Sequence, residues 1–177
     1  MSKVNIIIII CLCFYSTISI PQTIAVVNIQ NIIDNNSQYV EILKEIENSQ
    51  IEYFDDFEIK ENELKEKLKD LESSKLILSE NEINNQIDLY NKELNVFTNS
   101  VDAFNLHYQN QIINIREKIL KEIISLLEKY ALNNKIDLIL DSTTYLIASN
   151  SINITNNINE ELREINLKLE YENFEKN

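Results

Sequence analysis

The most constraining feature of this sequence is a long apolar stripe with helical spacing between Ile83 and Tyr130. Its members recur mostly at steps of three or four residues, which places them on one face of a helix. They are Ile83, Ile87, Tyr90, Leu94, Phe97, Val101, Phe104, Tyr108, Ile112, Ile115, Ile119, Ile123, Leu126 and Tyr130. A helix that continues to Asn134 is roughly 75 Å long at 1.5 Å per residue. A chain of 177 residues cannot enclose such a helix in a globule, so we expect the helix to project from the body.

A narrower apolar stripe precedes it, from about Gln38 to Leu78. With Val40 placed at heptad position a, the d positions are apolar in five of six cases and the a positions in three of six. A stripe of this width pairs with one partner helix and leaves the other faces charged. The polar segment 79–82 separates the two stripes, and Ser79 with Glu82 has the form of a capping box. These features predict an antiparallel helical hairpin, here called the arm, over residues 38–133 with its tip near 79–82.

The composition excludes several function classes. The chain has no glycine and one proline, which leaves few sharp breaks and suits long helices. Loops that hold nucleotide phosphates need glycine so that the backbone can approach the phosphates, and P-loop and Rossmann sites are therefore not expected. The net charge of −13 repels nucleic acid phosphates, so no nucleic acid partner is expected either.

Short apolar runs flank the arm. Residues 24–29, 135–141 and 145–148 are rich in apolar and β-branched residues and are predicted to form three strands. Thr155 is expected to cap a final helix. The apolar positions of that helix are Ile158, Leu162, Ile165 and Leu169. The polar segment 171–177 is expected to be a frayed tail.

The predicted fold class is therefore α+β, with a long helical arm that projects from a small β-rich body formed by residues 20–37 and 134–170. Three short strands form a sheet that is too small to bury an apolar face by itself. We therefore expect the body to form by oligomerisation. The residues expected at its centre are Ile24, Val26, Val27, Ile136, Leu138 and Leu140.

The N-terminal segment is typical of an export signal. Lys3 precedes an apolar run, and small residues follow it, which predicts a signal peptide over residues 1–19 and a periplasmic mature protein. An uncleaved anchor over residues 4–20 is the alternative, since 17 residues are at the short end of a membrane span. Both cysteines, Cys11 and Cys13, lie in this segment, so the mature chain has no thiol for a disulfide, a metal site or a nucleophile.

This layout resembles the Skp/OmpH family of periplasmic chaperones. The resemblance depends on residues 24–28 directly after the signal segment, on residues 136–141 directly after the arm, and on the stretch from Ile154 to Leu162 that leads into the final helix. It implies a homotrimer in which strands of three subunits build the body and three arms surround a cavity. It also implies that unfolded outer-membrane β-barrel proteins are held there without ATP or another cofactor.

The charge of the arm departs from the family pattern. Familiar members are basic, whereas residues 38–100 hold 16 acidic and 7 basic side chains here. We find no basic cluster suited to lipopolysaccharide and do not expect lipopolysaccharide binding. Apolar contacts are expected to provide more of the client binding, where a client is the unfolded protein that the chaperone holds.

The sequence offers little for catalysis or metal binding, so no enzyme activity, metal or cofactor is expected. His107 is the only histidine and is interpreted as a surface residue of the arm. Asp137 and Asp141 share a strand face, but Asp141 fits the start of a turn better than a catalytic pair.

Aromatic residues of the arm are the candidate client-binding positions. Most are expected to join the two helices, and some are expected to face a client. The candidates are Tyr53, Phe54, Tyr90, Phe97 and Phe104. Tyr53 is the preferred candidate because it lies off the predicted a and d positions. The alternative function is a structural or adhesive coiled-coil protein of the envelope, anchored by its N-terminal apolar segment.

Overall fold

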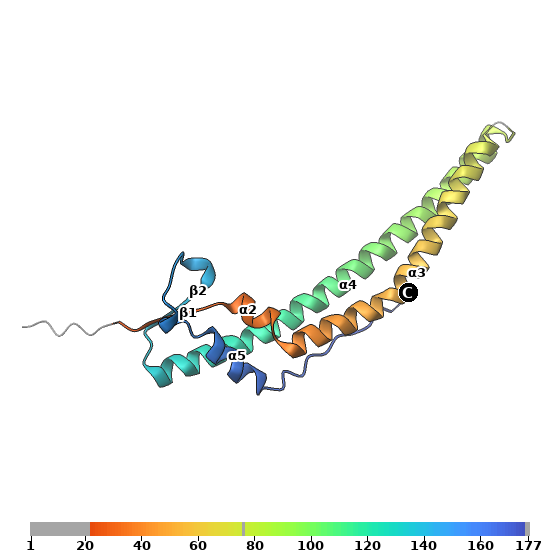
Figure 1. The fold of residues 1–177 in the computed structure, drawn as a ribbon. Helices are drawn as coiled ribbons and strands as arrows, with labels where there is room; N and C mark the ends of the chain where they lie inside the picture. The colour runs from red at the N-terminus through yellow and green to blue at the C-terminus, as the bar shows by residue number, and fades with distance from the viewer. Residues whose placement is uncertain (1–21, 76, 176–177) are drawn as a thin grey trace, which may run out of the picture.

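A computed structural model describes residues 22–75 and 77–175 of the chain (Figure 1). It confirms the α+β organisation, with two long helices beside a small sheet. The predicted signal peptide and the alternative anchor fall on residues outside the described part. The elements in chain order are β1 (Ile24–Val27), α2 (Ile29–Asp34), α3 (Ser37–Ser74), α4 (Glu80–Asn134), β2 (Leu138–Asp141), the 3-10 turns η1 (Ser142–Thr144) and η2 (Asn150–Ile152), and α5 (Thr155–Arg163).

The two long helices form the arm and run antiparallel to a narrow tip. The turn lies between Ser74 and Glu80, so residues 80–82 belong to the first turn of α4. The N–H of Ser79 donates to the Glu82 carboxylate at 3.0 Å, and the Ser79 hydroxyl donates to the same oxygen at 2.6 Å. This is the Ser79–Glu82 pairing that the sequence predicts at the start of the second helix.

The predicted stripe of α4 is the buried face of that helix from Phe104 onward, where Phe104, Tyr108 and Ile119 are almost fully buried. On α3 the predicted a positions are wrong, because Val40, Phe54 and Leu68 are exposed.

The buried face of α3 near the body lies one position earlier. Tyr39 and Ile46 are buried and Tyr53 is half-buried. The reason is that α3 contacts two surfaces there, α4 on one side and the C-terminal segment on the other. A heptad pattern assumes a single partner helix and therefore misplaces this face.

β1 and β2 form a parallel pair in which Ile24 is opposite Leu138 and Val27 is opposite Asp141. Parallel strands need a long crossover connection, and the whole arm serves as that connection here. β1 ends two residues earlier than predicted, and β2 begins three residues later than predicted. The Asn28 side chain accepts from Asn31 N–H and caps α2, which the sequence did not predict. Lys135 takes a left-handed conformation with φ of 54° at the end of α4.

The predicted third strand over residues 145–148 is wrong. These residues form no strand, and Leu146 and Ile147 are exposed. The second edge of β1 is taken by a later segment instead, since Val26 bridges Asn153 and the N–H of Ile154 donates to Val26 O at 2.9 Å. Within residues 22–75 and 77–175 the sheet therefore has two strands.

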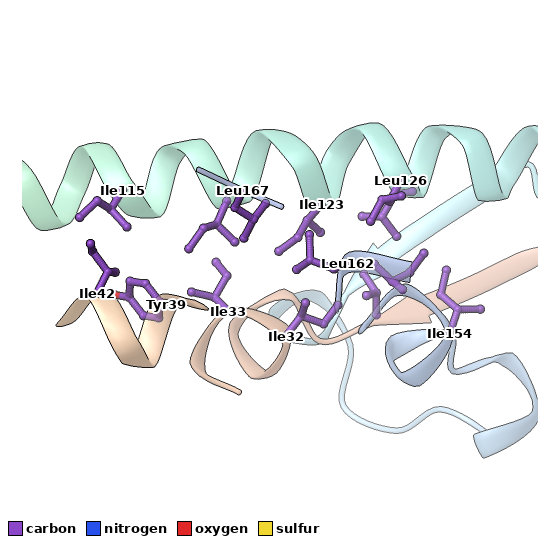
Figure 2. Close-up of a cluster of buried hydrophobic side chains, with 14 of the residues drawn as sticks. Ile32, Ile33, Tyr39, Ile42, Ile115, Ile123, Leu126, Ile154, Leu162 and Leu167 are labelled. Carbon is purple, nitrogen blue, oxygen red and sulfur yellow. The ribbon is translucent and has the colours of Figure 1, made fainter. Parts of the chain in front are cut away.

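The core lies where α2, the start of α3 and α5 pack against the C-terminal half of α4 (Figure 2). Its fully buried side chains include Ile32, Ile119, Ile123, Ile158 and Leu162. Ile158 and Leu162 occupy the predicted face of the final helix, but Ile165 and Leu169 lie beyond its end at Arg163.

Thr155 is the first residue of α5, and Ile154 is the residue that precedes the helix, so the predicted capping role of Thr155 is wrong. The Thr155 hydroxyl instead accepts from the N–H of Asn28 at 2.9 Å, which ties α5 to the end of β1.

The segment 164–175, here called the tail, runs extended back along the arm toward its middle (Figure 1). The predicted fraying is wrong for residues 171–175, because Tyr171 and Phe174 pack against the buried cluster. Within the described part of the chain, no helix carries an apolar stretch sufficient to cross a membrane.

We expect Asp141 to make the sheet sensitive to acid. Burial raises the pKa of its carboxyl, but hydrogen bonds from the N–H and hydroxyl of Thr143 and from the N–H of Ile29 lower it more, and the pKa lies below the ordinary Asp value. A depressed folded-state pKa gives stability that is present above the unfolded pKa of about 3.9 and is lost as the pH falls through the folded pKa. Asp141→Asn should therefore lower the urea midpoint at pH 6, and its difference from the wild type should shrink below about pH 4. Asp88→Asn, on an exposed part of α4, is the control. An unchanged difference across this range would contradict the assignment.

Candidate functional site

The arm carries an aromatic cluster centred on Phe104, whose side chain is 0% exposed. Tyr53 and Phe57 of α3 contact the Phe104 ring with centroid distances of 5.3 and 5.2 Å, and Tyr108 lies one turn along α4 at 5.0 Å. Most of these pairs are edge-on, the arrangement that aromatic rings favour. The cluster holds the two helices together near the middle of the arm.

The tail covers one side of this cluster. Phe174 contacts Phe104 with a centroid distance of 5.5 Å and Tyr53 with one of 5.7 Å. The Tyr53 hydroxyl donates to the carbonyl oxygen of Phe174. The His107 ring packs on Phe174, and its Nε2 lies 2.7 Å from the carbonyl oxygen of Glu172. The only histidine of the chain thus binds the tail main chain.

The predicted client-binding residues lie in different environments. Phe104 is buried, and Tyr53, predicted to lie off the a and d positions, is half-buried beneath Phe174 of the tail. Phe54 is 52% exposed. Phe97 packs edge-on against Phe57 at 6.1 Å. The structure brings Tyr53, Phe54, Phe97 and Phe104 into one region of the arm.

Tyr90 lies apart from the aromatic cluster, closer to the tip. It lines a shallow hollow between the helices with Lys67, Leu71 and Glu93. Lys67 pairs across this hollow with Glu93 at 2.5 Å, and this hydrogen bond lowers the pKa of the Glu93 carboxyl. Because the pair is exposed, its contribution to stability is small.

Beside the aromatic cluster, a second hollow opens between the helices. Phe54, Phe57, Phe97 and Val101 line it, together with Phe104. Four aromatic rings form half of its wall, and Glu58, Glu61 and Asn105 add polar groups. The hollow and Phe174 both contact the Phe104 ring.

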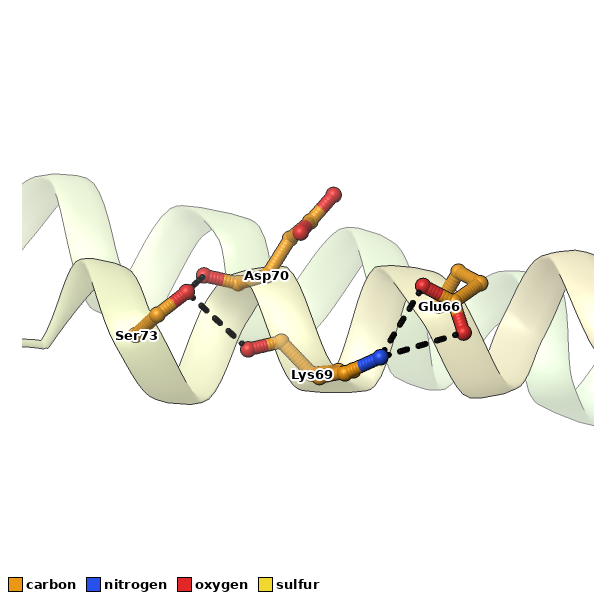
Figure 3. A network of polar contacts seen from close by, with 4 residues as sticks. All are labelled: Glu66, Lys69, Asp70 and Ser73. Atoms are coloured by element: carbon orange, nitrogen blue, oxygen red, sulfur yellow. Dashed lines mark hydrogen bonds and ion pairs between the residues drawn. The ribbon is translucent and has the colours of Figure 1, made fainter.

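The charged positions of α3 form a solvated face, as the sequence indicates. Lys65 pairs with Glu61 at 2.7 Å, and Lys69 lies 3.5 Å from Glu66 (Figure 3). The Ser73 hydroxyl donates to the main-chain oxygens of Lys69 and Asp70 and stays within the same helix. These contacts follow helical spacing and are typical of an exposed helix surface.

Sequence reasoning missed two sets of apolar residues. The first is the tail pair Tyr171 and Phe174, which was assigned to a frayed end. The second is a set of exposed aliphatic residues of α4 outside the buried stripe: Leu89, Val96, Leu106 and Ile113. The steps of seven residues within this set were visible in the sequence as a second, weaker stripe.

The acidic strand residues have structural roles. The Asp137 carboxylate accepts from the N–H of Thr23 at 2.8 Å, and Asp141 binds the N–H of Ile29 at 3.2 Å. Both therefore tie the N-terminal segment to β2. Among residues 22–75 and 77–175, no three His, Cys, Asp or Glu side chains are grouped to hold a metal ion.

Comparison with known proteins identifies the family. The model of the OmpH-like outer membrane protein family matches residues 23–162, which include both strands and the complete arm. This chain belongs to the OmpH-like family. The resemblance to Skp/OmpH proteins seen in the sequence is thereby confirmed. A comparison with curated protein sequences finds no match.

A solved structure supports the same fold. It is a Caulobacter crescentus protein described as a candidate OmpH-like outer membrane chaperone, and it superposes with a TM-score of 0.63 at 11% sequence identity. The match covers 88% of this chain and 92% of the other. The two proteins thus share a fold although their sequences are only 11% identical.

We expect the aromatic cluster to stabilise the arm. Phe104→Ala should lower the free energy of unfolding by about 3–5 kcal/mol, because it removes a fully buried ring and leaves a cavity. Phe54→Ala, at a half-exposed ring of the same cluster, should cost about 1 kcal/mol or less. Urea unfolding followed by circular dichroism measures both. Equal losses in the two variants would contradict a cluster centred on Phe104.

Proposed function

We propose that the chain is a periplasmic holdase chaperone that binds unfolded outer-membrane proteins without ATP. The observation that carries this proposal is the arm, which projects from a small body and exposes apolar side chains along its length in a chain of the OmpH-like family. The related solved protein is described as a candidate outer membrane chaperone, which favours the same role. The absence of glycine argues against a phosphate-binding loop and hence against ATP use.

The client surface is proposed to be apolar and diffuse. The half-exposed Phe54 and the exposed aliphatic residues of α4, among them Val96 with 70% exposure, offer contact area to an unfolded chain. Such contacts are not directional and do not select a sequence. They suit a protein that holds many clients, and the acidic arm adds little attraction to an acidic client.

A homotrimer is proposed as the working form. A parallel pair of two short strands is too small to be stable alone. Ile24 and Leu138 are opposite each other in this pair and remain 38% and 47% exposed. Leu146 and Ile147 lie nearby in the chain and are also exposed. These residues provide an apolar surface that partner subunits would cover, and the number three follows from the family resemblance.

Export is proposed from the N-terminal segment. Residues 1–19 have the charge and apolar pattern of a signal peptide, and the mature chain would begin near Ile20. Recovery of the protein in the membrane pellet with Met1 intact would favour the anchored coiled-coil protein instead.

The trimer is testable by sedimentation of residues 20–177. We expect a species of three chains, and Leu138→Asp should dissociate it, because an unpaired charge in a covered apolar surface costs several kcal/mol. The arm helices should keep much of their circular dichroism signal. The matched control is Asp88→Asn on the arm, which should leave the mass unchanged. A folded wild-type monomer would contradict the proposed assembly.

The holdase activity is testable by light scattering of a diluted, urea-unfolded outer-membrane β-barrel protein. We expect the purified protein to suppress its aggregation without nucleotide. Raising the salt from about 0.01 to 0.1 M shortens the Debye length from about 30 to 10 Å, which screens repulsion between the acidic arm and an acidic client. Protection should therefore stay constant or improve. Loss of protection in salt would indicate a local basic patch, and no protection at any salt concentration would refute the holdase.

A further inference from the structure

Most hydrogen bonds between the tail and the arm involve main-chain groups of the tail. The Gln38 side chain donates to the carbonyl oxygen of Ile165 at 2.8 Å and accepts from the N–H of Leu167 at 3.0 Å. Lys118 donates to the carbonyl oxygen of Lys168 at 2.5 Å. These contacts involve groups that nearly every peptide has, so they do not depend on the tail's own side chains.

The same kind of contact continues toward the end of the tail. His107 binds the carbonyl oxygen of Glu172, and the Tyr53 hydroxyl donates to that of Phe174. The N–H of Phe174 donates to the Tyr108 hydroxyl at 3.4 Å. Side chains of both arm helices therefore bind main-chain groups along the tail, as in a groove that accepts an extended peptide.

The tail side chains that face the arm are apolar. Leu167 is 4% exposed, and Tyr171 and Phe174 are half-buried against the core cluster. Phe174 lies on the Phe104 ring, which also lines the hollow formed by Phe54, Phe57 and Phe97. The groove therefore takes three aliphatic side chains at alternate positions, those of Ile165, Leu167 and Leu169, followed by two aromatic side chains three positions apart.

The charge of the tail is poorly matched to this groove. Glu170, Glu172 and Glu175 bring three carboxylates to an arm whose α3 segment 38–58 holds seven acidic side chains and one basic. Lys168 is the exception in the tail, because it lines a hollow with Glu41 and Glu45, which carry the opposite charge. Like charges weaken the attachment of the tail at low salt, and an extended segment without acidic residues would bind the same contacts without this cost.

We propose that this groove is a binding site for extended client segments that carry paired aromatic residues and few acidic ones, and that the tail is its built-in competitor. The inference builds on the proposed holdase function and adds a defined site to its diffuse surface. The tail occupies the groove in the absence of client and leaves when a better-matched segment binds. Apparent client affinity is then reduced by the fraction of chains in which the tail is bound.

The test uses the full mature chain and a fluorescent peptide with the sequence of residues 164–175. In Tyr171→Ala/Phe174→Ala the competing side chains are absent, and this variant should bind the peptide about tenfold more tightly than the wild type. Asn173→Ala, at an exposed tail position between them, is the matched control and should behave as the wild type. A peptide with Glu170, Glu172 and Glu175 replaced by Gln should bind still more tightly at low salt. Equal peptide affinity of variant and wild type would overturn the proposal.

A displacement experiment then tests whether an unfolded client binds in the same groove as the peptide. An excess of a urea-unfolded outer-membrane β-barrel protein should release the labelled peptide from the variant. If the peptide stays bound while aggregation of that protein is suppressed, the groove only fastens the tail and the holdase function stands without it. If aggregation is not suppressed, the holdase fails, and release of the peptide still decides the groove separately.

A conservative variant keeps the test valid if the double variant loses its helical signal. Tyr171→Phe retains the ring and removes the tail hydroxyl that donates to the carbonyl oxygen of Glu45 at 3.3 Å. The variant weakens the bound tail but not the peptide, which keeps its own tyrosine, so peptide affinity should rise by a few-fold, in line with the loss of one hydrogen bond from the tail. Unchanged peptide affinity in Tyr171→Phe would then overturn the proposal.

Discussion

The parallel pairing of β1 with β2 is the constraint on which the rest of the structure depends. These strands are separated in sequence by the complete arm, yet Ile24 is opposite Leu138. The pairing is reinforced at its two ends, where Asp137 binds the N–H of Thr23 and Asp141 binds that of Ile29. Because the chain must leave and return at one place, its two long helices have to run antiparallel. The geometry of the arm at its base is therefore set by the sheet.

The second organising feature is the use of the C-terminal half of α4 as a common support. The helix α2, the start of α3, α5 and the tail all pack along it. This explains why the apolar stripe of α4 is the cleanest in the sequence and why its burial is deepest between Phe104 and Leu126. Toward the tip only α3 remains as a partner, and the stripe becomes half-exposed there.

Sequence reasoning succeeded where one periodicity dominates. The stripe of α4, the Ser79–Glu82 start signal and the strands at Ile24 and Leu138 were all readable, because each follows from local spacing or local capping chemistry. The Skp/OmpH resemblance was also correct. On α3 the d positions Leu64 and Leu71 are buried as predicted, but the a positions near the body were misplaced by one residue, because the tail adds a second contact surface that a local pattern does not reveal. The strand at 145–148 was overpredicted, since apolar alternation does not supply a ladder partner.

The residues of the aromatic site could be predicted from the sequence, but the exposure of their side chains could not. Tyr53, Phe54, Phe97 and Phe104 do lie in one region, as helical spacing implies. Phe174 covers Tyr53 and Phe104 from 70 or more residues away in sequence, and composition cannot show such a contact. The charges of the tail suggested an unstructured end, whereas its apolar side chains pack on the arm and its main-chain groups accept and donate hydrogen bonds there. A short acidic chain end with isolated aromatic residues can therefore be a bound, ordered segment as well as a frayed one.

Since the helical hairpin departs from and returns to a fixed base, its reach is independent of how that base is built. Among the described residues, the tail contacts the arm between its base and Phe104, and from that ring to the tip the two helices contact each other. Equal insertions of whole heptads in both helices above this level would move the tip outward and leave the base unchanged. The volume that a set of such arms can enclose is thus set by arm length and can change with client size while the structure of the base stays the same.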